Sequence, residues 1–261
     1  MSGIASNCLG LITIPLVLSV FLSFPCRAAE QNGYQIAEKA YNIEDGNDFE
    51  SDMLMKIVKA DGSEKKRDLK VYRKDYGKDT RVLMVFRSPA DVKDTSFLTW
   101  NFSDKDNDLW MYLPALRQVS RIAAADKSKS FMGSDYSYED FTKRNLQKDD
   151  FVLLKEETIG DYPCYVVEAR AKDKNEKCTR RLVWIQKDNF LIVRADFFDG
   201  SKDPIKRFTT SNIKKINDIW TVLSGKMENL KTGGWTTIDL SNVRYNSGLP
   251  DKLFKKEGLS K

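Results

Sequence analysis

None of the 261 residues of this chain is histidine, and this limits the reactions that the chain could catalyse. Histidine is the usual general base of serine and cysteine hydrolases and the commonest metal ligand. Its absence excludes the ordinary Ser-His-Asp and Cys-His arrangements and every histidine-ligated metal site. Only motifs that work without histidine are left to consider.

The first such motif is Ser63-Glu64-Lys65-Lys66, which has the S-x-x-K form of serine β-lactamases and penicillin-binding proteins. Ser103-Asp104-Lys105 and Lys231-Thr232-Gly233 follow in the order that these enzymes use. The nucleophile of those enzymes must open a buried helix, whereas Ser63 follows the turn signal Asp61-Gly62. A second S-x-x-K, Ser211 to Lys214, shows how easily the pattern arises by chance. We therefore disfavour an enzyme.

The second motif is acidic. Asp104-Lys105-Asp106-Asn107-Asp108 resembles the start of a calcium-binding loop. Leu109 stands where that loop requires glycine, and Ala115 stands where it requires a bidentate glutamate. A solvated turn explains the segment better, and Asp239 fits the polar side of a strand. The sequence therefore predicts no catalytic residue, no cofactor and no metal.

The elements that position the other side chains are mostly strands. Apolar residues at helical spacing predict one helix over Tyr34 to Asn42. From Phe49 the period changes to two, and Asp61-Gly62 predicts a hairpin turn. Further strand-like runs cover residues 81–86, 96–102, 109–113, 151–159, 162–171, 179–186, 190–198, 205–216, 219–230 and 235–245.

Roughly a dozen strands joined by short turns, with no helical pattern between them, predict one antiparallel sheet. A sheet of more than about ten strands tends to close or split. We therefore expect a mainly β fold with a few helices, in which the sheet curls to bury one face. No internal repeat or low-complexity linker indicates a second domain.

An uncharged apolar segment opens the chain. The first 26 residues carry no charge, and residues 9–24 are almost wholly apolar, as in a signal peptide. Cys26 and Ala28 supply small residues before the expected cut. We therefore predict a signal peptide over residues 1–28, followed by a single domain over residues 29–261. The alternative is a retained membrane anchor, because the usual lysine or arginine near the start is missing.

Export would leave Cys164 and Cys178 in an oxidising compartment, where a disulfide is allowed. If a hairpin turning near Lys174 places Cys178 opposite Arg170, the two cysteines lie about 20 Å apart at strand rise. A disulfide tolerates a Cα separation of only about 7 Å. We therefore predict two free thiols.

The charge pattern bears on the class of partner. The formal net charge is +5, and lysine and arginine are matched by nearby acidic residues instead of forming one block. We therefore expect no nucleic-acid partner. Contact with an anionic membrane surface stays open.

Methionine and phenylalanine recur on one side of the early strands. Methionine is flexible and polarizable, which suits a wall that repacks around variable apolar ligands, although it is also ordinary core filler. A barrel of this strand number needs side chains, a helix or a ligand inside it. The candidate lipid-cavity residues are Phe49, Met53, Met55, Ile57, Leu69, Val71, Met84, Phe86 and Phe97.

A long irregular stretch from Pro114 to Thr142 interrupts the strands, and long loops in compact domains are usually functional or disordered. Polar residues and a glycine surround Phe131 and Met132, which favours a mobile segment over a buried strand. We expect these two residues to be gate or partner contacts and not core. The candidate lid or partner loop comprises Asp126, Lys127, Ser130, Phe131, Met132, Gly133, Ser134 and Asp135.

Two parts of the chain resemble the outer-membrane lipoprotein-sorting protein family. The first part comprises residues 110–116, 119–122, 126–128 and 130–140, within which Phe131-Met132-Gly133-Ser134-Asp135 is the specific block. The second comprises residues 216–220, 227–233 and 245–251, which are moderately specific. The resemblance covers nearly all of the mature chain.

The resemblance implies an incomplete β-barrel with a helical lid that shields acyl chains, as in the carrier and the outer-membrane receptor of the Lol pathway. It further implies a periplasmic location and, as partners, lipid or lipoprotein acyl chains. An exporter of the resistance-nodulation-division type or an outer-membrane acceptor would be a further partner. No position matches the lid-anchoring arginine of the Lol carrier. The alternative function is a periplasmic scaffold or accessory module of an envelope export complex, without lipid cargo.

Overall fold

A computed structural model describes residues 32–259, so the predicted signal peptide, with Cys8 and Cys26, lies outside the described residues. Within them, the helix α1 (Gly33–Tyr41) precedes thirteen strands. The strands are β1 (Asp48–Val58), β2 (Glu64–Tyr76), β3 (Asp79–Ser88), β4 (Ser96–Asn101), β5 (Asp108–Leu113), β6 (Gln118–Arg121), β7 (Asp149–Ile159), β8 (Tyr162–Ala171), β9 (Arg180–Gln186), β10 (Ile192–Phe198), β11 (Lys206–Ile216), β12 (Ile219–Asn229) and β13 (Trp235–Tyr245).

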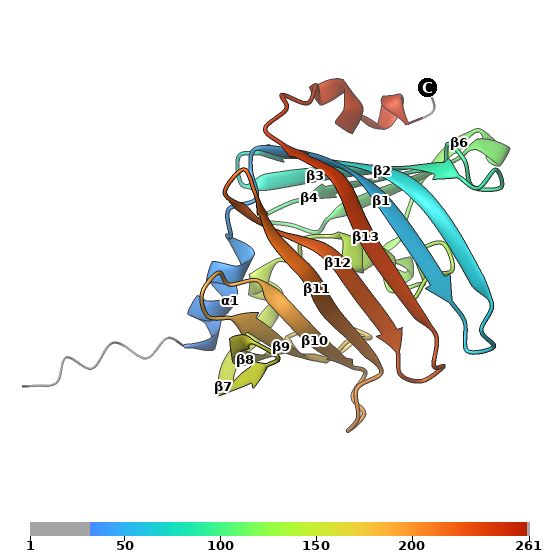
Figure 1. The fold of residues 1–261 in the computed structure, drawn as a ribbon. Coiled ribbons are helices and arrows are strands. Elements are labelled where there is room, and N and C mark those ends of the chain that lie inside the picture. The colour runs from blue at the N-terminus through green and yellow to red at the C-terminus, as the bar shows by residue number, and fades with distance from the viewer. Residues whose placement is uncertain (1–31, 260–261) are drawn as a thin grey trace, which may run out of the picture. The chain divides into compact units, whose positions relative to one another are not determined.

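All thirteen strands belong to one antiparallel sheet with the order β6-β5-β4-β3-β2-β1-β13-β12-β11-β10-β9-β8-β7. The sheet curls without closing, because β6 and β7 are its two edges (Figure 1). The prediction of a mainly β fold with an incompletely closed sheet is confirmed. The short strand β6 was not predicted, because it lies inside the stretch expected to be irregular and is mostly exposed.

The segment 122–148 joins the two edges of the sheet and lies within its curl (Figure 1). It contains the short 3-10 helices η2 (Ala124–Asp126), η3 (Tyr138–Phe141) and η4 (Leu146–Lys148), whereas η1 (Pro114–Leu116) lies in the turn between β5 and β6. Because the segment joins the two edges of the curled sheet, it crosses the concave face.

Helix α1 begins with a capping box, in which the Asn32 side chain accepts from the Gln35 nitrogen at 2.9 Å. Ile36 is buried against Val167 and Ile185, so α1 covers part of the concave face of β7–β9. Gly33 allows this approach, because a Cβ there would lie 2.6 Å from the Leu153 nitrogen. No helix within residues 32–259 is long and apolar enough to cross a membrane.

The concave face of β1–β5 is filled by a hydrophobic core whose centre is Phe131, a residue with 0% exposure. Its ring centroid lies 5.1 Å from that of Phe97 and 4.6 Å from that of Phe141. The predicted period of two holds on β1, since Met53 and Met55 are buried in this core whereas Leu54 is 38% exposed. Aromatic pairs of this kind add stability beyond the area that they bury.

The expectation that Phe131 and Met132 stand outside the core is therefore wrong. Phe131 is fully buried, and Met132 packs partly buried against the same cluster. The polar residues around them close a tight turn, in which the Phe131 nitrogen donates to the Tyr136 oxygen at 2.7 Å and the Ser130 hydroxyl donates to the Ser134 oxygen at 2.6 Å. The turn satisfies the backbone locally, and this allows a polar segment to deliver an aromatic ring to the core.

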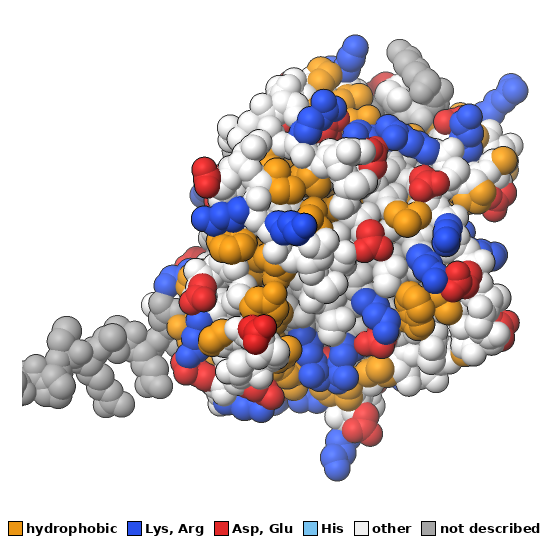
Figure 2. Space-filling view, in the orientation of Figure 1, with side chains coloured by type: hydrophobic (Ala, Val, Ile, Leu, Met, Phe, Trp, Pro, Cys, Tyr) orange, Lys and Arg blue, Asp and Glu red, His pale blue; other side chains and the backbone are white. Residues whose placement is uncertain are grey.

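The C-terminal segment covers the convex face of the same strands with the 3-10 helices η5 (Asp251–Phe254) and η6 (Lys256–Gly258) (Figure 1). Phe254 is fully buried there with Leu98, and its carbonyl oxygen accepts from the Trp100 indole nitrogen at 3.0 Å. Elsewhere on the surface, Figure 2 shows positive and negative side chains interspersed on one face, with hydrophobic side chains between them. The half of the sheet formed by β1–β5 is thus packed on both its concave and its convex face.

Cys164 and Cys178 are both free, as predicted. The predicted register is wrong, however, because Arg170 pairs with Arg180 and not with Cys178. The turn is longer than assumed, and the Ala171 nitrogen donates to the Thr179 oxygen at 3.0 Å before it begins. The free thiols therefore follow from the separation of the two cysteines along the hairpin, although the exact pairing differs.

Removal of the Phe131 ring is expected to destabilise the fold. The substitution Phe131→Ala should cost about 3–5 kcal/mol of unfolding free energy in urea, the usual effect of truncating a buried phenylalanine. Leu116→Ala is the matched control, because Leu116 is 65% exposed and its loss should stay within about 0.5 kcal/mol. Equal, small changes for both variants would contradict the placement of Phe131 in the core.

Candidate functional site

The concave face of β7–β10 borders a cavity of about 1170 Å³. The residues of α1 that face it are Ala37, Ala40 and Tyr41. The inward positions of the four strands give it an apolar wall, which consists of Phe151, Val167, Ala169, Val183, Ile185, Ile192, Ala195 and Phe197. The curled sheet therefore has one filled half, around Phe131, and one hollow half.

The segment 122–148 forms the opposite wall of this cavity. From the predicted lid or partner loop, Lys127, Ser130, Ser134 and Asp135 line the cavity. Asp126, Phe131, Met132 and Gly133 do not line it, since the turn that carries Phe131 is directed into the core of the other half. The loop predicted to be a lid thus covers the cavity with its polar residues.

The residues predicted to form a lipid cavity lie in the other half of the sheet. The candidates pack against one another and around Phe131, and none of them lines the cavity: Phe49, Met53, Met55, Ile57, Leu69, Val71, Met84, Phe86 and Phe97. The correct part of the prediction is that these residues share one concave face. Their alternation shows that they point inward, but it does not show that a distant loop fills the space that they enclose.

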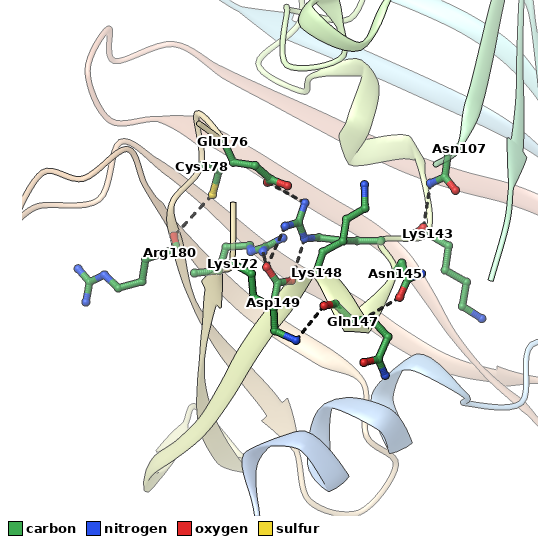
Figure 3. A network of polar contacts seen from close by, with 12 residues as sticks. Asn107, Lys143, Asn145, Gln147, Lys148, Asp149, Lys172, Glu176, Cys178 and Arg180 are labelled. Atoms are coloured by element: carbon green, nitrogen blue, oxygen red, sulfur yellow. Dashed lines mark hydrogen bonds and ion pairs between the residues drawn. The ribbon is translucent and has the colours of Figure 1, made fainter. Parts of the chain in front are cut away.

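An ionic cluster of Arg144, Asp149, Glu176 and Arg181, here called the Arg144 cluster, ties the segment to β7 and β9 (Figure 3). Arg144 donates from two nitrogens to the Asp149 carboxylate, each at 2.8 Å, and lies 2.9 Å from Glu176. Arg181 donates to the same Asp149 carboxylate at 2.7 Å. The Asp149 side chain is only 3% exposed, so it is the buried centre of the cluster.

The electrostatics of the Arg144 cluster favour its charged form. Burial lowers the pKa of Arg144, but the hydrogen bonds that Arg144 donates to Asp149 and Glu176 outweigh burial and raise its pKa above the ordinary value. Backbone contacts support the same junction, since the Lys172 ammonium donates to the Gln147 oxygen at 2.9 Å (Figure 3). The segment is therefore held to the cavity rim by charged and polar contacts.

A second polar group lies where the segment meets β11. The Lys206 ammonium lies 2.6 Å from the Asp140 carboxylate and 4.8 Å from the centroid of the Phe197 ring. Burial raises the pKa of Glu139 and also that of the Cys178 thiol, so both groups resist ionisation. Lys206 therefore stands at the junction between the apolar wall and the polar side of the cavity.

Two residues that line the cavity each carry a buried polar atom with no hydrogen-bond partner among the described residues. These atoms are the Tyr136 hydroxyl and the Arg181 Nε. Tyr136 is 5% exposed, and burial raises the pKa of its hydroxyl far above the ordinary value, so it stays protonated and can donate. Buried donors without acceptors are costly in a folded protein.

This arrangement suits binding. It combines an apolar wall, charged groups and unused hydrogen-bond donors, which is the usual composition of a site for an amphiphilic ligand. The thiol of Cys178 lines the cavity, but burial keeps it protonated, whereas a nucleophilic cysteine needs a lowered pKa. The lining therefore offers no activated thiol.

Neither the Arg144 cluster nor the apolar wall of β7–β10 was predicted from the sequence. One signal was available for the wall, because Val167, Ala169, Val183 and Ile185 alternate along neighbouring strands as regularly as the early methionines do. Nothing in the sequence pairs Arg144 with Arg181 across the curl. That contact depends on how the segment crosses the concave face.

Comparison with known proteins places the chain among similar folds. A family profile described as "Uncharacterized protein" matches residues 78–261. A DUF1329 family protein from Desulfovibrio piger is 36% identical with a TM-score of 0.82, over 87% of this chain and 97% of that one. A putative outer membrane lipoprotein-sorting protein domain from Vibrio parahaemolyticus is 31% identical with a TM-score of 0.83, over 88% of this chain and 98% of that one.

A LolA superfamily protein from Nitrosomonas europaea shares the fold, with a TM-score of 0.68 and 24% identity over 87% of this chain and 99% of that one. No curated protein sequence matches the chain. The Desulfovibrio piger and Vibrio parahaemolyticus proteins are more than 30% identical to this chain over almost their whole lengths, so they resemble it in sequence as well as in fold.

Loss of the carboxylate at the centre of the Arg144 cluster should be strongly destabilising. Asp149→Ala leaves two arginines without their buried partner, a change that typically costs about 3–5 kcal/mol. Asp150→Ala is the control on the same strand, because the Asp150 side chain is 72% exposed and its ion pair should contribute about 0–1 kcal/mol. Chemical denaturation measures both, and an Asp149 effect no larger than that of Asp150 would refute the structural role of the cluster.

Proposed function

The chain belongs to the outer-membrane lipoprotein-sorting family, and from this premise we propose that it is a periplasmic carrier or receptor for lipid or lipoprotein acyl chains. The observation that carries the proposal is the cavity of about 1170 Å³ with its apolar wall on β7–β10. Ligand pockets of proteins usually measure about 300–1,000 Å³, so this cavity has room for an acyl chain.

The free energy available to such a carrier is large. Each CH₂ group removed from water contributes about 0.8 kcal/mol, so a chain of about 16 carbons gives a gross ~12 kcal/mol before ordering costs. No covalent bond needs to form or break. Release of the cargo would then require the cavity to open, because a chain held this strongly dissociates slowly from a closed site.

In this proposal the segment 122–148 is the lid, and its two ends differ. Phe131 fixes one end through apolar burial, whereas Arg144 holds the other end through ion pairs with Asp149 and Glu176. Opening at the Arg144 end would expose the cavity and leave the core around Phe131 intact. The predicted cavity residues of β1–β4, such as Met53 and Phe97, would contact acyl chains only if Phe131 also left the core.

The location and the partners are part of the same proposal. Export by a signal peptide over residues 1–28 would deliver the domain to the periplasm. An exporter of the resistance-nodulation-division type or an outer-membrane acceptor would supply or receive the cargo. The Vibrio parahaemolyticus relative, described as a putative outer membrane lipoprotein-sorting protein domain, supports a role in the cell envelope.

A scaffold without lipid cargo is the second candidate. It is favoured by the edge strand β7, on which Val152 is 50% exposed and Leu154 is 48% exposed. Edge strands present unpaired backbone groups that another chain can extend. A scaffold would use this edge and would bind its partner equally well with the cavity filled.

Filling the cavity separates the two candidates. Ala169→Trp places a large side chain against the apolar wall and should weaken binding of a fluorescent fatty acid about tenfold, since it displaces at least two CH₂ groups of the ligand. Val152→Trp is the control, because Val152 is opposite Glu168 on the next strand and does not line the cavity. Both variants should keep the β-sheet signal in circular dichroism. Unchanged binding by a folded Ala169→Trp protein would count against acyl burial here.

A further inference from the structure

The cavity contains donors whose hydrogen-bonding capacity is not used. The Arg181 Nε and the Tyr136 hydroxyl are buried without a partner among the described residues, although both side chains line the cavity. A guanidinium has five N–H donors and accepts nothing, so only an acceptor can satisfy it. The acceptor that this position lacks could come from a ligand.

The Lys206 ammonium, at the edge of the apolar wall, has N–H donors that its carboxylate partner does not use. The ammonium carries three donors, and its one carboxylate partner within the described residues is Asp140. That carboxylate also accepts from the Ser137 nitrogen at 2.6 Å and from the Ser137 hydroxyl at 2.7 Å, so it is well supplied with donors. The Lys206 side chain is 19% exposed and lies over Phe197, where a ligand on the wall would pass.

Lys206 and Arg181 act on a common region of the cavity. Phe197 pairs with Arg181 on β9 and with Lys206 on β11, so the three side chains lie on the same face of the sheet. The lining as a whole is also cationic, with nine lysines and arginines against seven acidic side chains.

We propose, as a refinement that rests on the proposed function, that the cargo is an amphiphile with an anionic headgroup whose oxygens bind Lys206 and Arg181. The headgroup is a carboxylate or a phosphate, and the acyl chain lies over Phe197 along the wall of β8–β10. Tyr136 supplies a further donor from the segment. Charge-assisted hydrogen bonds of this kind are about twice as strong as neutral ones, so they discriminate between headgroups.

Other headgroups fit these residues less well. A cationic headgroup would meet two like charges, and an uncharged glycerol would offer Lys206 and Arg181 only neutral acceptors, which bind such donors less strongly than charged ones. Inorganic phosphate alone would satisfy the donors but would not use the apolar wall. The combination of wall and donors therefore selects a ligand that carries both chemistries.

Competition binding tests the inference directly. A fluorescent fatty acid is displaced from the wild-type protein by palmitate, by palmitoyl lysophosphatidic acid, by the uncharged monopalmitoylglycerol of equal chain length, and by inorganic phosphate. We expect at least one anionic amphiphile to bind about tenfold more tightly than the uncharged one, the difference given by one charge-assisted contact. Whether palmitate or the lysophospholipid is preferred distinguishes a carboxylate from a phosphate headgroup. Inorganic phosphate should displace nothing.

Variants of Lys206 identify the residue responsible. Lys206→Gln should abolish the preference by weakening the anionic ligands about tenfold while leaving monopalmitoylglycerol unchanged, and Lys206→Arg should keep it. Lys226→Gln is the matched control, because Lys226 pairs with Glu228 at 2.7 Å on the same sheet and does not line the cavity. It should keep the wild-type preference.

Three results would overturn the inference. They are equal affinity of the wild-type protein for charged and uncharged amphiphiles, a preference that survives in Lys206→Gln, and displacement by inorganic phosphate as effective as that by the lysophospholipid. In the first two cases the proposed carrier function stands, because the acyl chain still binds. If no amphiphile binds at all, the carrier function itself fails, so the two failures are distinguishable.

Discussion

Burial of Phe131 against the concave face of β1–β5 fixes how the rest of the domain is arranged. The sheet has two free edges, and the segment that connects them must cross the concave side. Once its aromatic ring occupies the core of one half, the remainder of the segment is placed over β7–β10. A filled half and a hollow half therefore arise from one apolar contact, and a cavity can exist without leaving the domain poorly packed.

The opposite end of the segment is held by a different kind of interaction. Asp149 receives hydrogen bonds from Arg144 and Arg181, and this contact joins the segment to two strands of the hollow half. Apolar burial depends on a large area removed from water, whereas the Arg144 cluster depends on a few charged groups paired around the buried Asp149. The segment is thus attached by apolar burial at one end and by ion pairs at the other.

The sequence predicted those features that depend on short-range patterns. Alternation placed Met53 and Met55 inward and Leu54 outward, and turn signals gave most strands to within two residues. Prediction from the sequence failed where contacts between residues far apart in the chain decide whether a side chain is buried. Polar neighbours made Phe131 look exposed, because the hydrogen bonds that close its turn involve backbone atoms that composition does not reveal.

The location of the cavity could not be predicted for the same reason. The inward residues of β1–β5 and those of β7–β10 have similar patterns, and only the path of the segment decides which set faces a core and which a cavity. The Arg144 cluster likewise unites residues from the segment, from two strands and from a hairpin turn. Its members carry no common motif in the sequence.

The central claim is that this domain encloses acyl chains in the hollow half of its sheet. Native mass spectrometry of the mature protein, purified from the periplasm without detergent, tests that claim most directly. We expect a population heavier than the polypeptide by the mass of a lipid, which collisional activation releases intact. A single species at the polypeptide mass, in protein that also fails to take up added lipid, would contradict it.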